Sequence, residues 1–251
     1  MDAKYNKIGV NYSVSRCTDP KIAKQLYAEL RDATKIVNIG AGTGSYEPEG
    51  VELVAVEPSL EMISQRKKGA HKVEQSFAEN LSFENNSFSH AMIVLSMHHW
   101  EDRDSAFREI NRVTTDKFVA VSWDPSSAPF WLTRDYFPEI YKADLRIFPK
   151  LNELEKYFDE VEMKPLLIPD DCKDGFLAAF WKRPEAYLNE QVRQSISAFS
   201  NLDNVSEGLE KLTQDLASGK WKKNNSAILN ASFLDVGYKL ITAKTRNSER
   251  I

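Results

Sequence analysis

The sequence has few of the features that mark secreted, membrane or metal-stapled proteins. It contains two cysteines, Cys17 and Cys172, which lie far apart and outside any C-x-x-C spacing, so a disulfide framework and a cysteine zinc site are excluded. No apolar run approaches the roughly 18 residues of a membrane span, and the polar start of the chain lacks the apolar segment of a signal peptide. We therefore expect a reduced, cytoplasmic protein that does not bind a membrane.

A strong excess of one charge is also missing. The 251 residues include 33 Lys and Arg and 37 Asp and Glu, which give a formal net charge of −4. Proteins that bind nucleic acid depend on basic residues that neutralise phosphates. The acidic balance therefore favours a small-molecule partner over nucleic acid, and we expect a monomer or a homodimer. Hydrophobic residues make up 42% of the chain, which is sufficient for the core of a globular domain.

Strand and helix patterns alternate through the first half of the chain. Short runs rich in β-branched residues predict strands at 35–39, 51–56, 71–75, 90–95 and 118–123. Helical spacing of apolar residues and capping signals predict helices at 20–30, 59–68 and 104–113. The alternation favours parallel strands with helices on both faces of one sheet.

The pattern loosens after Trp123. We expect helices at 151–158, 185–199 and 206–217, and strands at 161–168 and 235–243, the last of them antiparallel. About half of the aromatic residues lie between Trp123 and Tyr187, which is typical of a cap over a pocket but also of a small second core. The predicted division has a core of residues 1–124, 151–170 and 232–246 and an inserted substrate cap of residues 125–150 and 171–231.

A glycine-rich segment follows the first predicted strand directly, with the sequence Asn38-Ile39-Gly40-Ala41-Gly42-Thr43-Gly44. Glycines let the backbone turn tightly and approach a ligand at the carboxyl edge of a parallel sheet. Glu57 ends the second predicted strand, where a carboxylate can accept hydrogen bonds from both hydroxyls of a ribose. The loop and the acid together predict a nucleoside site. The third glycine comes one residue too early for the G-x-G-x-x-G of a dinucleotide site.

The spacing G-x-G-x-G resembles motif I of the class I S-adenosylmethionine-dependent methyltransferases. Three further segments are similar to that family in the same order: Val54-Ala55-Val56-Glu57-Pro58, Ala78-Glu79-Asn80-Leu81-Ser82-Phe83 (its A-E-x-L-P-F) and Ser87-Phe88-Ser89-His90-Ala91 (its S-F-D). The similarity spans about 5–123 and is nearest to the small-molecule branch, methyltransferase type 11, with the ubiquinone/menaquinone and trans-aconitate methyltransferases. It implies a Rossmann-like α/β fold: a seven-stranded, mostly parallel sheet with helices on both faces, an antiparallel final strand, and a helical cap inserted after strands 5 and 6.

The resemblance implies S-adenosylmethionine as cofactor and a set of residues that hold it. These are Tyr12, Asn38, Gly40, Ala41, Gly42, Gly44, Glu57, Pro58, Met62, Ala78, Glu79 and Leu95. The sequence departs from the family where Asn38 replaces an acidic residue and where Phe77 replaces an Asp. The family's long helix after motif I must also shrink to a turn or two, because only about twelve residues separate the first two strands.

Candidates for catalysis and acceptor binding follow the predicted fourth strand and continue into the cap. His98 and His99 lie near the expected methyl position, where one of them can serve as a general base or simply pack there. No third ligand accompanies these histidines, so we expect no metal site. Four other residues are candidates for contact with the acceptor: Trp100, Asp124, Trp131 and Arg183.

The sequence therefore predicts methyl transfer from S-adenosylmethionine to a small-molecule acceptor by in-line displacement, with the cofactor held by residues 40–44 and Glu57. The acceptor atom, whether oxygen, nitrogen or carbon, stays open. Three alternatives stay open as well: an RNA or protein methyltransferase, a nucleoside-binding Rossmann protein without methyl transfer, and a nicotinamide-dependent oxidoreductase.

Overall fold

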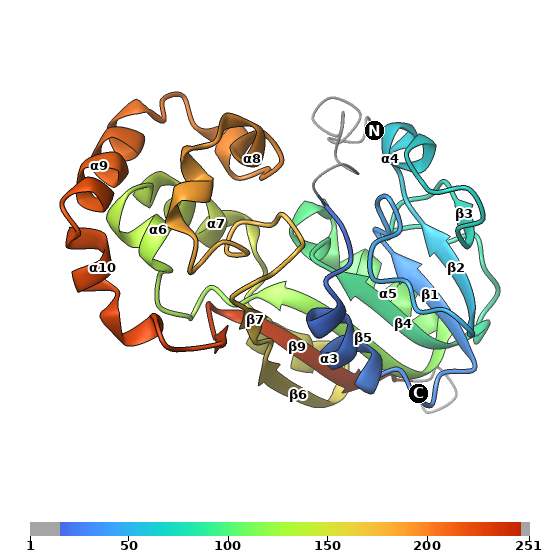
Figure 1. Ribbon diagram of the computed structural model, residues 1–251. Coiled ribbons are helices and arrows are strands. Elements are labelled where there is room, and N and C mark those ends of the chain that lie inside the picture. The colour runs from blue at the N-terminus through green and yellow to red at the C-terminus, as the bar shows by residue number, and fades with distance from the viewer. Residues whose placement is uncertain (1–15, 247–251) are drawn as a thin grey trace.

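A seven-stranded sheet forms the centre of the protein (Figure 1), whose computed structural model describes residues 16–246. Its strands, in the order β3-β2-β1-β4-β5-β9-β6, are Lys72–Glu74, Glu52–Val56, Lys35–Ile39, Phe88–Val94, Thr114–Trp123, Tyr238–Lys244 and Asp159–Pro165. Strands β1 to β5 pair in parallel, whereas β9 runs antiparallel between β5 and β6. The predicted mostly parallel sheet with an antiparallel final strand is confirmed.

Helices cover both faces of this sheet. Helix α3 (Pro20–Ala28) buries Ile22 and Leu26 in one apolar cluster with Ile36 of β1. Helix α5 (Arg103–Val113) buries its apolar side in a second cluster, which contains Val37 of the same strand. Because neighbouring residues of a strand point to opposite faces, the two helices lie on opposite sides of the sheet. The prediction of helices on both faces is therefore confirmed.

The connections near the glycine loop are shorter than expected. Residues 40–51 form turns and no helix, so β1 reaches β2 without even the one or two helical turns that we predicted. Helix α4 (Leu60–Ser64) begins at the predicted cap, Ser59, but ends well before residue 68. Just beyond the helix, the Arg66 guanidinium donates hydrogen bonds to Glu47 and to the carbonyl of Gly42.

The remaining helices form a group to one side of the sheet (Figure 1): α6 (Trp131–Asp135), α7 (Pro138–Ile147), α8 (Glu190–Gln194), α9 (Ser206–Ala217) and α10 (Lys220–Asn224). Short 3-10 helices, η1 to η5, span Met97–His99, Leu151–Lys156, Pro184–Leu188, Phe199–Asn201 and Ser226–Ile228, and β7 (Ile168–Pro169) pairs with β8 (Phe233–Leu234). The predicted helices at 151–158 and 185–199 are therefore wrong in type and extent. Asn189 interrupts the second one, because its side chain caps α8 by accepting a hydrogen bond from Gln191 N.

The helices of this group are held together by a separate apolar cluster. Its buried members include Trp131, Tyr187, Leu212 and Trp221. Five residues of the segment 172–181 belong instead to the cluster on the α3 face of the sheet, namely Cys172, Phe176, Ala178, Ala179 and Trp181, whereas Leu177 packs against the cluster of the helical group. The exact boundaries of core and cap stay a prediction. Across residues 16–246, no helix is both long enough and apolar enough to cross a membrane.

Candidate functional site

The glycine loop at the end of β1 has a conformation and a packing that a larger residue at position 40 would disturb. Gly40 adopts a φ of +69°. A Cβ atom at this position would lie 2.5 Å from both Cβ and Oγ of Ser96, the residue that begins the turn after β4. Ser96 is itself fixed, because its hydroxyl donates a 2.9 Å hydrogen bond to the carbonyl of Ile39. Glycine is therefore required here for both backbone geometry and space.

Glu57 links this loop to the end of β2. Its carboxylate accepts hydrogen bonds from Gly42 N at 2.8 Å and from Ser59 N at 2.9 Å, and the residue is only 5% exposed. Burial raises the pKa of Glu57, and the two backbone hydrogen bonds partly offset that rise. Since a carboxylate has about four acceptor positions, two remain for hydroxyl groups of a ligand.

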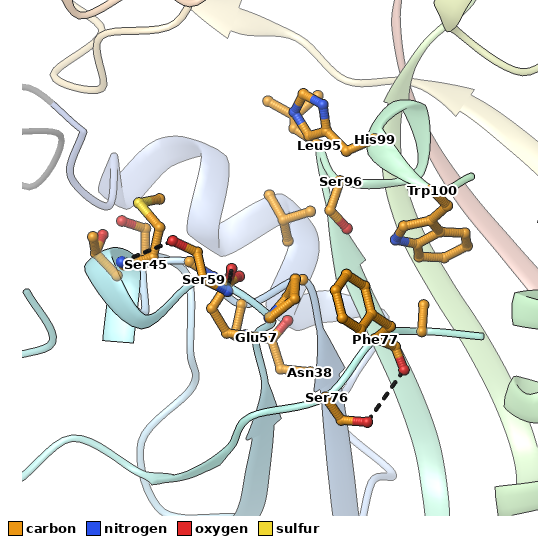
Figure 2. A pocket seen from close by; sticks show the side chains of 18 of the residues that line it. Asn38, Ser45, Glu57, Ser59, Ser76, Phe77, Leu95, Ser96, His99 and Trp100 are labelled. Atoms are coloured by element: carbon orange, nitrogen blue, oxygen red, sulfur yellow. Dashed lines mark hydrogen bonds between the residues drawn. The ribbon is translucent and has the colours of Figure 1, made fainter. Parts of the chain in front are cut away.

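A cavity of about 290 Å³, called the cofactor cavity below, opens between the loop, Glu57 and the end of β4. Figure 2 shows Glu57 and Ser59 on one side, Phe77 and Trp100 on the other, and Leu95 beside His99. Ten of the residues predicted to hold the cofactor line it: Asn38, Gly40, Ala41, Gly42, Glu57, Pro58, Met62, Ala78, Glu79 and Leu95. Gly44 is not among the lining residues and packs beside Arg66, and Tyr12 lies outside the described residues.

A buried ion pair lies next to the glycine loop, and no sequence pattern predicts it. Arg66 and Glu47 approach to 2.8 Å, with both side chains only 5% exposed. Glu47 also accepts a 3.1 Å hydrogen bond from Asn38 Nδ2, so the amide nitrogen is engaged and the Asn38 carbonyl oxygen is left for a ligand. Glu47 lies nine positions after Asn38, and no sequence pattern predicts their contact, because it depends on the path of the turns between them. The pair therefore supplies a buried carboxylate beside Asn38.

The two histidines are the last residues of η1 (Met97–His99), which follows β4 after Leu95 and Ser96. Leu95, which precedes the turn, has a φ of +53°. His98 stacks on Phe148, with ring centroids 4.2 Å apart and planes inclined by 18°, and the His99 ring lies 3.8 Å from that of His98. His99 lines the cofactor cavity, whereas His98 does not. Their role as a general base stays a prediction.

A second cavity of about 70 Å³, called the acceptor cavity below, adjoins the cofactor cavity. Three residues line both of them: Arg16, Leu95 and His99. Its other walls come from η1, from α7 and the residue that follows it, and from segments 176–177 and 196–201. A third cavity of about 20 Å³ continues from it and shares Asp144, Phe148, Leu177 and Tyr238. The three cavities thus follow one another from the glycine loop into the helical group.

The four residues predicted to contact the methyl acceptor do not lie together in the structure. Trp100 lines the cofactor cavity. Asp124 accepts hydrogen bonds from the amide and hydroxyl of Ser126 and lines neither the cofactor nor the acceptor cavity. Trp131 lies in the apolar cluster of the helical group, where its indole donates to the carbonyl of Trp181. Arg183 donates to the carbonyls of Cys172 and Ala179, away from the acceptor cavity.

Residues that the sequence did not single out line the acceptor cavity instead, namely Arg16, Asp144, Phe148, Phe176 and Tyr238. Arg16 forms a 2.6 Å ion pair with Asp174, whose side chain is fully buried. No local pattern marks these residues, because they come from four separate segments of the chain. In the part of the chain that the structure describes, no group of three or more His, Cys, Asp or Glu side chains is placed to bind a metal ion.

Comparisons with known proteins identify the family. A family described as a methyltransferase domain matches residues 37–117. A protein of Anabaena variabilis, whose crystal structure is described as that of a methyltransferase from an antibiotic biosynthesis pathway, is 34% identical. The match has a TM-score of 0.82 and covers 91% of this chain and 98% of that one. The chain belongs to the class I S-adenosylmethionine-dependent methyltransferases. It is therefore an enzyme, and S-adenosylmethionine is its cofactor, as the resemblance implied.

Two more distant solved structures share the fold. An S-adenosylmethionine-dependent methyltransferase of Thermotoga maritima is 18% identical with a TM-score of 0.53, over 90% of this chain and 88% of that one. A geranyl diphosphate C-methyltransferase of Streptomyces coelicolor, crystallised with S-adenosylhomocysteine, is 14% identical with a TM-score of 0.50, over 89% and 75%. Because both sequence identities are low, these two matches show that the fold is shared and show nothing about substrate or role. Among curated proteins, no match to this chain is found.

Proposed function

We propose that this methyltransferase acts on a small molecule that binds in the acceptor cavity. The observation that supports the proposal is the shared wall of Arg16, Leu95 and His99, because it means that a second cavity adjoins the cofactor cavity. Its volume of about 70 Å³ suits a small ligand or part of one. The lack of a nucleic-acid partner, the monomeric or dimeric state and the cytoplasmic location stay predictions.

The cofactor cavity fits S-adenosylmethionine by the chemistry of its walls. The two open acceptor positions of Glu57 suit the ribose hydroxyls, and the Asn38 carbonyl oxygen suits the ammonium group of the methionine part. Phe77 and Trp100 offer apolar surface for the adenine ring (Figure 2). When bound, the cofactor supplies an electrophilic methyl group on a sulfonium.

The residues between the two cavities then position the acceptor. Holding a nucleophile close to the reacting carbon and aligned with it is by itself a large source of acceleration. His99 lines both cavities, which supports a role for its ring as the base that accepts a proton from an acceptor that must lose one. His98, stacked on Phe148, forms part of the wall beside it.

A labelling experiment tests the proposal. The enzyme is incubated with S-adenosylmethionine carrying a tritiated methyl group and with an extract of its source cells divided by size into small molecules, RNA and protein. We expect label to appear in the small-molecule fraction only. Label in RNA or protein would overturn the proposal in favour of a macromolecular acceptor.

A further inference from the structure

One partly buried carboxylate that lines the acceptor cavity has no partner within residues 16–246. Asp144 lies on α7 and lines both the acceptor cavity and the third cavity. Its side chain accepts no hydrogen bond and forms no ion pair there, although its backbone carbonyl accepts one from Phe148 N. Burial raises the pKa of Asp144 to about 7, and no neighbouring group lowers it. Charged groups that are removed from water are normally paired, so a counterion would stabilise the ionised form of this carboxylate.

The charged and titratable groups around the cavity do not supply that counterion. Arg16 is the only arginine or lysine among the described residues that line it, and it is 2.6 Å from Asp174 instead. Tyr238 is buried and its pKa is raised, so the phenol is neutral at physiological pH. The remaining titratable neighbours are His98 and His99 of η1.

Aromatic rings surround the carboxylate. Phe148 and Trp123 meet edge to face at 5.4 Å between ring centroids, as do Phe176 and Tyr238 at 5.1 Å. Phe148, Tyr238 and Trp123 line the third cavity together with Asp144. Aromatic faces attract organic cations, and a carboxylate attracts them further through a charge-assisted hydrogen bond. An anionic acceptor would instead be repelled by Asp144, which is the only acidic side chain among the described residues that line this cavity.

We propose that the acceptor is a small organic cation and that Asp144 binds its ammonium group inside this aromatic wall. The inference rests on the proposed function, since it names the class of acceptor for the same site. Asp144 lines the third cavity but not the cofactor cavity, so the ammonium group is anchored on the side away from the glycine loop. The atom that receives the methyl group lies at the other side, near His99. The third cavity, at about 20 Å³, has room for one group of the size of a water molecule or an ammonium.

The charge of the labelled compound tests this inference without knowledge of its identity. The small-molecule fraction is first separated at pH 7 on ion-exchange resins into cationic, neutral and anionic pools, and each pool is incubated with enzyme and tritiated S-adenosylmethionine. We expect label in the cationic pool. Label in the neutral or anionic pool would overturn the inference but leave the proposed function intact, whereas label in no pool, or only in macromolecules, would overturn both.

The variant D144N tests the residue itself. We expect the amount of cationic pool needed for half-maximal labelling to rise at least tenfold, while the affinity for S-adenosylhomocysteine, measured by calorimetry, changes less than twofold. E139Q on the same helix is the matched control, because Glu139 is exposed and its replacement removes the same charge. Equal half-maximal amounts for D144N and the wild type would overturn the assignment of Asp144.

Discussion

Replacing Asp144 with Asn is expected to stabilise the protein, by an amount that grows with pH. Burial raises the pKa of this carboxyl from its ordinary value of 3.8 to about 7. Each pKa unit corresponds to about 1.4 kcal/mol, so the ionised form costs at most about 4 kcal/mol, and its partial exposure reduces this to about 2–4 kcal/mol.

The sign follows from proton binding. Between pH 4 and pH 7 the folded protein keeps the Asp144 proton that the unfolded chain has released, so the free energy of unfolding falls as pH rises through this window. D144N lacks this titration. Its advantage over the wild type should therefore be about 40% of its full size at pH 5 and should be nearly complete by pH 8.

Urea denaturation followed by tryptophan fluorescence measures this difference at pH 5, 6, 7 and 8. The cost of burying the Asn side chain is the same at every pH, so it shifts all four free energies of unfolding equally. The part of the difference between D144N and the wild type that changes with pH therefore comes from the carboxyl group. E139Q should follow the wild type at every pH, because Glu139 is exposed. A difference between D144N and the wild type that does not change with pH would refute the reasoning.

Two further substitutions probe the glycine loop and its support. G40A should weaken binding of S-adenosylhomocysteine at least tenfold in calorimetry, because the added Cβ would lie 2.5 Å from Ser96 Oγ; unchanged affinity would contradict the packing described for the loop. R66M should lower the free energy of unfolding in urea by about 3–5 kcal/mol, because it leaves Glu47 buried without its ion-pair partner. R66M combined with E47Q should recover part of that loss, and no recovery would argue against the pairing.

The sequence predicts the sheet and the cofactor loop well because their signals are local. A strand buried on both faces carries a run of apolar residues such as Ile36 and Val37, and a backbone with positive φ at position 40 calls for glycine. Glu57 is found by its place at the end of β2. Each of these signals is local in the sequence, although Gly40 also packs against Ser96 and Glu57 also accepts a hydrogen bond from Gly42 N.

The parts that sequence reasoning missed depend on distant contacts. Asp144 looks like an ordinary polar residue of an amphipathic helix, and only the packing of α7 near η1 and β9 makes it a partly buried carboxylate in a cavity wall. One error has a local cause: the helix expected at 185–199 breaks at Asn189, which caps α8 by accepting a hydrogen bond from Gln191 N. Arg183 and Trp131 resembled acceptor ligands by composition, yet their polar atoms are used by nearby carbonyls.

Calorimetric titration with S-adenosylhomocysteine tests the central claim, that the glycine loop and Glu57 form the cofactor site. E57A removes the carboxylate that accepts hydrogen bonds from Gly42 N and Ser59 N, and E52A removes an exposed carboxylate from the same strand as a control. We expect the wild type and E52A to bind alike, E57A to bind at least tenfold more weakly, about 1.4 kcal/mol or more, and NAD not to bind at all. Equal affinity of E57A and the wild type, in a variant with an unchanged circular dichroism spectrum, would contradict the assignment of the site.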